Sequence, residues 1–211
     1  MSSQPQQVVT LDAHNIRGLA HPLRVKMLGL LREQGPATAS GLAARTGQSS
    51  GATSYHLRQL AAYGFIVEAE DLGNERERWW RAAHRTTSME VAGPADEESQ
   101  IFAEEYLRGV ASGYAERMYL WVDSLAHQPK PWADAGTISD WMMRLTPEQA
   151  LALTEQLSAF VQKYADEHPA TADVEAEGAE GTAADAGSDT ERVFVQLQVL
   201  TAPTETSTPS R

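Results

Sequence analysis

The chain has 211 residues, of which 42% are hydrophobic, and it carries a formal net charge of -12 without a single cysteine. This length is enough for one small domain and a second unit or arm. The absence of cysteine excludes disulfides, thiolate nucleophiles and zinc-thiolate sites, and it fits a reducing cytoplasm. No run approaches the roughly 18 apolar residues of a membrane helix, and the first residues are polar. We therefore expect a cytoplasmic protein without a membrane span or a secretory signal.

The acidic charge is concentrated in the C-terminal half. Residues 1–90 contain 10 Lys and Arg against 8 Asp and Glu, a net charge of +2, whereas the remainder contains 7 against 21, a net charge of -14. An N-terminal domain of charge +2 is only mildly basic. If it binds nucleic acid, we expect binding to depend on salt and on the pairing of two copies.

The first predicted elements are a disordered lead and two helices. Residues 1–11 form the lead, and Asp12 to Ala20 reads as a short helix that Asp12 caps. Pro22 opens a second helix that runs to about Gln34. Its apolar stripe is formed by Leu23, Met27, Leu30 and Leu31.

A helix, a tight turn and a second helix follow. The first helix runs from Ser40 to Thr46 and breaks at Gly47, and the second ends before Gly64. Successive residues of a helix are turned by about 100°, which divides the second helix into two faces. The face expected to pack holds Thr53, His56, Leu57, Leu60 and Gly64. The opposite face, expected to meet a partner, holds Gly51, Ser54, Tyr55 and Arg58.

A two-stranded hairpin is predicted after these helices, with strands at 65–70 and 75–81 around a Gly-Asn turn. Helix-turn-helix followed by a hairpin is the arrangement of winged-helix DNA readers. A helix in the major groove needs small residues, hydroxyls and a long cationic donor. The predicted contacts to double-stranded DNA, with the last two reaching backbone phosphates or the minor groove, are Gln48, Ser49, Ser50, Ser54, Tyr55, Arg58, Arg76 and Arg78. A winged-helix module that binds a protein without specific DNA binding is the alternative.

Three linked motifs resemble the ArsR-type winged-helix transcriptional regulators. They are Leu19 to Leu28, Ser49 to Leu60 with its Ser54-Tyr55-His56-Leu57 core, and Gly64 to Val67. The resemblance covers about residues 12–88 and implies a homodimeric, sequence-specific DNA binder, usually a repressor that an effector releases. The chain departs from the metal-sensing members because it has no cysteine. Thiolate metal sensing is therefore excluded, and a small-molecule effector is left open.

One short motif matches a catalytic pattern. Residues 47–51 fit the G-x-S-x-G elbow of serine hydrolases, which requires a strand before the serine. Residues 39–45 read as helix instead, so we do not expect an enzyme. The histidines form no metal-binding pair such as H-x-H, and we expect no cofactor or metal. His21 reads as a helix-junction residue and His56 as a core histidine whose ring nitrogens are satisfied.

Beyond a winged-helix domain at residues 12–90, the chain predicts a long helix at 97–127. Its apolar residues recur at spacings of three and four and form a dimerisation seam of Leu107, Val110, Tyr114, Met118, Trp121 and Leu125. Pairing of two such seams about a two-fold axis would place two reading helices about one DNA turn apart. Packing as a core helix within one chain explains the seam almost as well, and the two roles can coexist.

The C-terminal residues 137–200 predict a small strand-helix-strand unit, interrupted by an acidic disordered linker at 166–190 and followed by a disordered tail at 201–211. The strands are expected at 137–145 and 192–200. Together with the winged helix, this predicts a mainly α fold with a small β component. Deletion of the acidic linker would tighten DNA binding if the linker competes for the basic face. An apolar ligand pocket, for which core packing is the simpler explanation, could be lined by Tyr114, Trp121, Trp132, Trp141 and Phe160.

Overall fold

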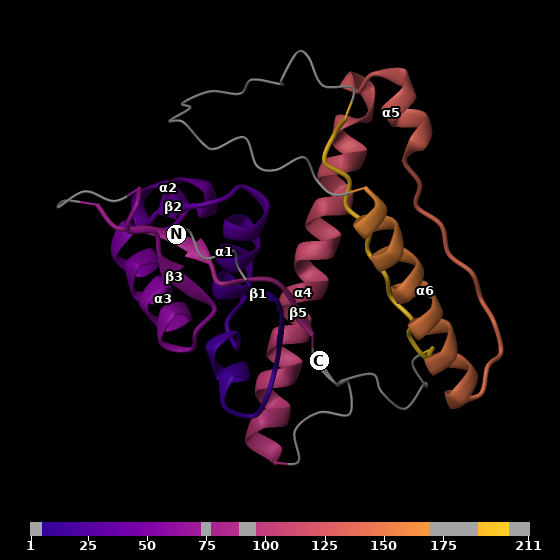
Figure 1. Cartoon of the computed structure of the whole chain (residues 1–211), viewed down its shortest axis with the longest axis horizontal. Helices are drawn as coiled ribbons and strands as arrows, with labels where there is room; N and C mark the ends of the chain where they lie inside the picture. The colour runs from indigo at the N-terminus through magenta and orange to yellow at the C-terminus, as the bar shows by residue number, and fades with distance from the viewer. Residues whose placement is uncertain (1–5, 73–76, 89–95, 169–189, 203–211) are drawn as a thin grey trace, which may run out of the picture. The chain divides into compact units, whose positions relative to one another are not determined.

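The computed structural model describes residues 6–72, 77–88, 96–168 and 190–202 of the chain. These residues belong to two compact units, 1–128 and 129–211. The fold is mainly helical with a few short strands, as the sequence predicts (Figure 1). In the described part of the chain, no helix is both long enough and apolar enough to span a membrane.

The first unit contains the elements that form a winged helix. In chain order they are β1 (Gln6–Thr10), the 3-10 helix η1 (Asn15–Gly18), α1 (Pro22–Glu33), β2 (Ala37–Thr38), α2 (Ala39–Thr46), α3 (Ser50–Ala62), β3 (Ile66–Glu68), β4 (Trp79–Ala82), β5 (His84–Ser88), the long helix α4 (Glu97–Ser124) and the 3-10 helix η2 (Leu125–His127).

Side-chain caps mark where the helices of this unit begin. The Nδ1 atom of His21 accepts the Leu23 N–H at 3.1 Å, directly before Pro22 starts α1. The Thr38 hydroxyl caps α2, and the Asp96 carboxylate caps α4. Gly47 ends α2 with a φ of 67°, a conformation that glycine adopts without strain.

Two small sheets complete the unit. Strands β2, β4 and β3 form a three-stranded antiparallel sheet in that order. β1 lies parallel to β5, with Val8 opposite Thr86 and Thr10 opposite Ser88. The prediction of a disordered lead at residues 1–11 is therefore wrong for residues 6–10, because β5 supplies a pairing partner far away in the sequence.

The predicted helix from Asp12 to Ala20 is also shorter than expected. Only η1 is helical, and the Asp12 carboxylate accepts the N–H groups of His14 at 2.8 Å and Asn15 at 2.7 Å. Asp12 thus caps a single tight turn, after which the chain bends toward α1.

The core lies between α1, α2, α3 and the three-stranded sheet. Its fully buried side chains include Ile16, Leu19, Met27, Leu42, Leu57, Leu60, Phe65 and Ile66. Trp80 of β4 is 9% exposed and closes the core from the sheet. The predicted α1 stripe is confirmed at Met27 and Leu31, which are buried.

Helix α4 runs alongside α1 and is fastened to it (Figure 1). Gly109 permits close approach, because a Cβ there would lie 3.1 Å from Val25. Two ion pairs flank this contact and join Lys26 to Glu116 at 2.8 Å and Glu33 to Arg117, and a third joins Arg17 of η1 to Glu98 of α4 at 2.9 Å. The N-terminal part of α4 therefore belongs to the core of its own chain, where Ala103 is buried.

Arg32 connects α1 to β5. Its Nε donates to the carbonyl of His84 at 2.9 Å, and its terminal nitrogen donates to the Thr87 hydroxyl at 2.8 Å. Because a guanidinium donates along fixed directions, the two bonds hold β5 in one register against α1.

The second unit contains α5 (Lys130–Ala135) and α6 (Pro147–Glu167). α6 begins with a capping box: the Gln149 N–H donates to the Thr146 hydroxyl, and the Thr146 N–H donates to the Gln149 side chain. Thr146 as the cap and Pro147 at the first helical position both favour a helix start at this point.

The strands predicted on either side of α6 do not form. Residues 137–145 and 192–200 have neither helix nor strand structure. Among the described residues, neither of the two sheets contains these segments. The linker predicted at 166–190 begins as the last turn of α6, and residues 169–189 and 203–211 lie outside the described part of the chain.

Candidate nucleic-acid interface

Helix α3 divides into a buried and an open face. Thr53, Leu57 and Leu60 are buried in the core. Tyr55 is 53% exposed, Gly51 and Arg58 are exposed, and Ser54 is half-buried. This distribution agrees with the two faces predicted from helical periodicity, except that His56 is only half-buried and Gly64, which follows the helix, is exposed.

The turn before α3 presents three exposed polar residues, Gln48, Ser49 and Ser50. The Ser49 hydroxyl accepts the Ala52 N–H at 3.2 Å and is therefore the N-cap. The Thr53 hydroxyl donates to the Ser49 carbonyl at 3.0 Å and ties this cap to the buried face. Ser50 stands in the first helical turn, where the helix dipole favours an anion.

Arg58 lies one turn further along the same face as Ser54. Its Nε donates to the Ser54 carbonyl at 3.2 Å, which lays the side chain along the helix surface. A guanidinium in this position keeps further N–H groups for an acceptor approaching from outside.

The wing, which is the hairpin of β3 and β4, contributes less positive charge than the sequence suggests. Arg78 is exposed and directly precedes β4 instead of lying within it, and its Nε is 3.8 Å from a carboxylate oxygen of Glu68. Arg81 forms an ion pair with Asp71. Exposed pairs of this kind contribute little to stability, so Arg78 can exchange Glu68 for another anion. Arg76 lies outside the described residues.

An exposed arginine that the sequence analysis did not select lies on α2. Arg45 is in the last turn of this helix, the first of the helix-turn-helix pair. The first helix crosses the DNA backbone in domains of this kind. The position of Arg45 just before the Gly47 turn was the signal that could have identified it.

His21, the N-cap of α1, and His56 of α3 have their rings in contact, tilted by 43° to each other. The rings of His21 and His56 have centroids 4.4 Å apart, and Tyr55 lies edge-on to His56 at 5.2 Å. His21 is the predicted helix-junction residue, because its ring caps α1. The prediction that the nitrogens of His56 are satisfied is wrong, since His56 Nδ1 and Arg24 Nε are buried without a hydrogen-bond partner in the described structure.

Burial lowers the pKa of His21 and of His56 from the ordinary value of 6.5, and the charge of Arg24 lowers both further. The neighbouring His21 ring also contributes to the low pKa of His56. Both rings are therefore held in the neutral form between α1 and α3. Protonation of His21 at Nδ1 would in addition remove the acceptor that caps α1.

These shifts predict that stability falls on acidification. With a folded-state pKa below the unfolded value of 6.5, the unfolded chain binds protons first as the pH drops, so the contribution is complete above pH 6.5 and is lost below it. Denaturant midpoints measured between pH 8 and pH 5 should decrease below about pH 6.5. In the variant His21→Asn, which keeps a capping oxygen, the denaturant midpoint should decrease less steeply with falling pH. If the midpoint falls with pH as steeply as in the wild type, the role of the His21–His56 pair is contradicted.

The predicted seam of α4 is partly open. Leu107 is 44% exposed and Met118 is 40% exposed. The remaining seam residues, all half-buried, are Val110, Tyr114, Trp121 and Leu125. α4 also packs on α1. Part of α4 therefore belongs to the core of its own chain, while seam residues such as Leu107 and Met118 remain exposed.

The residues that match the hydrolase elbow have a different structure. Ser49 is preceded by helix α2 and a left-handed Gly47, and no strand leads into it. A nucleophile elbow needs a strand-to-helix turn. The motif is therefore the turn of the helix-turn-helix.

Solved structures with limited likeness to this chain come from several bacteria. A double mutant of ZitR from Lactococcus lactis in the apo form is 16% identical, with 69% of this chain and 83% of that chain covered at a TM-score of 0.30. YusO from Bacillus subtilis is 15% identical, with 71% and 81% covered at a TM-score of 0.30. The adhesin competence repressor AdcR from Streptococcus pyogenes is 15% identical, with 70% and 81% covered at a TM-score of 0.30.

No curated protein matches the chain. Residues 19–69 match the family model of a helix-turn-helix domain. This range contains α1, α2, α3 and β3. The chain thus contains a helix-turn-helix domain, formed by the same helices that present the open face of α3.

Proposed function

We propose that the protein is a sequence-specific DNA-binding transcriptional regulator of the ArsR type, acting as a homodimeric repressor on a palindromic operator. The observation that carries this proposal is the division of α3. Thr53, Leu57 and Leu60 anchor one side in the core, and Tyr55 and Arg58 stand open on the other. A helix held in this way can enter the major groove without any rearrangement of its own domain.

The proposed contacts follow from the donors on this surface. The N-terminal turn of α3, with Ser50, binds a backbone phosphate, because the first amide N–H groups of a helix point outward. Ser54 and Arg58 lie one turn apart and read base edges, the guanidinium being suited to a guanine. Arg78, and Arg76 if the hairpin continues as the sequence predicts, hold a neighbouring phosphate.

Two copies would pair through the open apolar residues of α4. A palindromic operator presents two equivalent half-sites, so a single mildly basic domain gains affinity by binding as a pair. The predicted interface residues are Leu107, Val110, Tyr114, Met118, Trp121 and Leu125. Release by a small molecule is the proposed mode of regulation, following the resemblance to ArsR-type regulators.

The variant Arg58→Ala tests the proposed reading surface. DNA fragments are first selected from genomic DNA by the purified full-length protein, and binding of the strongest fragment is then measured by gel shift at two salt concentrations. Loss of a base contact should weaken binding by about 1 to 3 kcal/mol and relax the preference for the selected sequence. The control is Arg108→Ala, which removes another exposed arginine, from α4, and this variant should bind as the wild type does.

The alternative is a winged helix that binds a protein. It is favoured by the wing, where Arg78 and Arg81 each face a carboxylate, which reduces the positive field. If no genomic fragment is selected, or if Arg58→Ala and Arg108→Ala bind DNA equally well, the proposal of a DNA reader is wrong.

A further inference from the structure

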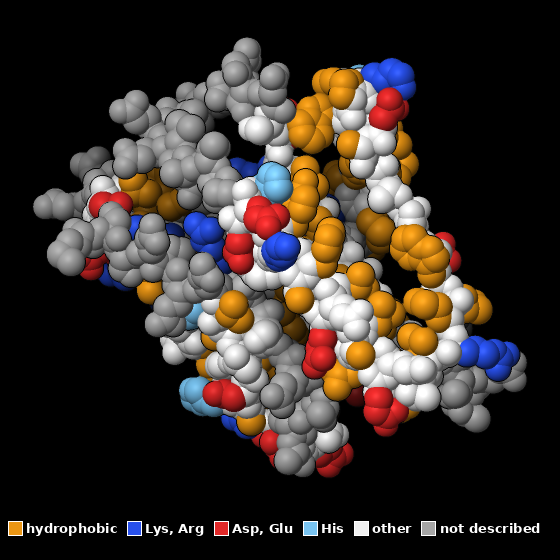
Figure 2. Space-filling view, turned by 45° about the vertical axis from the view of Figure 1, so that its right-hand side comes forward, with side chains coloured by type: hydrophobic (Ala, Val, Ile, Leu, Met, Phe, Trp, Pro, Cys, Tyr) orange, Lys and Arg blue, Asp and Glu red, His pale blue; other side chains and the backbone are white. Residues whose placement is uncertain are grey.

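The second unit has an apolar surface but no buried core of its own. Among its described residues, 129–168 and 190–202, no side chain falls in the buried class. Trp141 is 79% exposed, Met142 is 97% exposed and Phe160 is 67% exposed. Orange hydrophobic side chains stand open on the α6 side of the space-filling view (Figure 2). Isolated helices are marginal in water, and apolar patches of this kind mark interaction sites. Something must cover this surface.

Helix α6 carries the most ordered part of the surface. Leu153, Leu157, Phe160 and Tyr164 recur at spacings of four, three and four residues along its 21 residues. This alternation is the seam along which helices pack by placing knobs into holes. The rings of Phe160 and Tyr164 stack with centroids 6.4 Å apart, and Tyr164 stacks on His168 at 4.2 Å. The seam thus presents a preformed row of rings.

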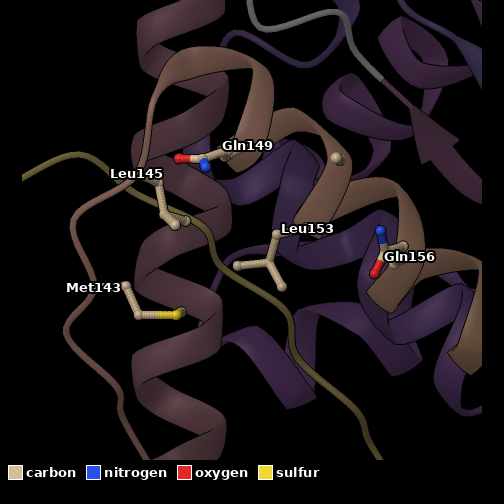
Figure 3. Close-up of a pocket in the computed structure, with 6 residues that line it drawn as sticks. Met143, Leu145, Gln149, Leu153 and Gln156 are labelled. Carbon is tan, nitrogen blue, oxygen red and sulfur yellow. The ribbon is translucent and has the colours of Figure 1, made fainter.

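A groove continues the seam toward the start of α6. It has a volume of about 310 Å³ and lies between the segment that holds Met143 and Leu145 and the face of α6 that holds Leu153. Figure 3 shows these three apolar side chains gathered together, with the amides of Gln149 and Gln156 on the helix beside them. A groove with an apolar lining and amides along one side suits a large apolar side chain from a neighbouring molecule.

We propose that a second copy of this chain covers this face, with α6 of one protomer packed against α6 of its partner about a two-fold axis. The first argument is symmetry: a two-fold interface uses the same patch on both copies, and a heptad-like seam is complementary to itself. The second is area. Phe160 and Tyr164 can each bury about 150 to 250 Å², so together with Leu153, Leu157 and the groove the two copies approach the roughly 1,000 Å² that a specific interface needs.

This inference deepens the proposed dimer by assigning it a second contact, independent of α4. It also explains why α6 has no buried core in its own chain, because the apolar residues of the second unit would be buried between two chains. Pairing through α6 as well as through α4 would lower the dissociation of the dimer at the same protein concentration, because two linked contacts reinforce each other.

The absence of cysteine from the chain provides a direct test. A single introduced cysteine can form a disulfide only with the same position in another copy. The full-length variants Leu153→Cys, Leu157→Cys, Phe160→Cys and Tyr164→Cys are oxidised at micromolar concentration and separated with and without reductant. The matched control is Leu151→Cys, at a position 60% exposed and nearly opposite the seam on α6.

At least one seam variant should form a covalent dimer several-fold faster than Leu151→Cys, because a two-fold axis through the seam brings some position within reach of its own copy, about 4 to 7 Å between Cα atoms. Equal rates at all positions would overturn the proposal. Coverage of the face by another part of the same chain, or by a small apolar molecule, gives this negative result.

Gel shift with the selected DNA separates this inference from the proposed function. A protein that shifts DNA but does not cross-link at α6 refutes the α6 pairing alone. A protein that cross-links at the seam but binds no DNA supports the pairing and refutes the DNA reader.

Discussion

Replacement of Phe65 by alanine should lower the free energy of unfolding of the first unit by about 3 to 5 kcal/mol. Phe65 is fully buried where α3 ends and β3 begins. Its amide donates to the Leu60 carbonyl at 3.0 Å and its carbonyl accepts the Ala83 N–H at 2.9 Å, so the backbone at this point is held from both sides. Because the backbone cannot collapse into the space, a cavity remains.

Chemical denaturation followed by tryptophan fluorescence measures this loss, since Trp80 lies in the same core. The variant Phe65→Leu, which preserves most of the volume, serves as the comparison and should lose less than about 1.5 kcal/mol. Similar losses for both variants would show that the side chain does not fill a rigid site. Phe65→Ala should also weaken DNA binding, because Leu57 and Leu60 of α3 lie in the same core as Phe65 and would lose packing that holds the helix in place.

Gly18→Ala should destabilise the same unit by about 3 kcal/mol, the upper part of the range for overpacked cores. A Cβ at this position would lie 2.6 Å from the Cβ of Tyr63 and 2.8 Å from the Cε2 of Phe65. The Cβ of Tyr63 is attached to the backbone and cannot rotate away. To accept alanine, η1 must therefore move away from the end of α3.

Gly29→Ala is the control for this prediction. A Cβ at Gly29, inside α1, meets nothing closer than an oxygen of Glu33 at 4.0 Å. Since alanine favours helix over glycine, this variant should be more stable than the wild type by roughly 0.5 to 1 kcal/mol. Thermal or chemical unfolding of the two variants should give shifts of opposite sign. A stable Gly18→Ala protein would mean that η1 does not pack on Tyr63 as described.

The helix-turn-helix could be predicted closely because its signals are local. Pro22, Gly47 and Ser49 mark helix ends by their own conformational preferences. The spacing of Thr53, Leu57 and Leu60 then identifies the buried side of α3, and hence the open side with Arg58. None of this requires knowledge of a distant part of the chain.

The predictions of local structure were wrong where the structure of a segment depends on a partner far away in the sequence. β1 forms because β5 pairs with it, and the short run of residues 6–10 does not by itself identify that partner. Conversely, the apolar alternation at 192–200 resembles a strand, but these residues do not adopt strand structure, because alternation alone does not supply a ladder with another segment. His56 shows the same limit within the site, since its unsatisfied nitrogen depends on His21 and Arg24 of another helix.

The sequence by itself determined α1, α2 and α3, the turn between α2 and α3, and which side of α3 remains open, because periodicity and the preferences of Pro22, Gly47 and Ser49 act over a few residues. Only the tertiary structure decided that α4 is bound to α1 through Gly109 and two ion pairs and to η1 through a third, that Arg32 holds β5, and that the described apolar residues of the second unit are not buried in a core of that unit. Those features depend on contacts between residues far apart in the chain, where the free energy of packing, rather than local preference, selects the partner.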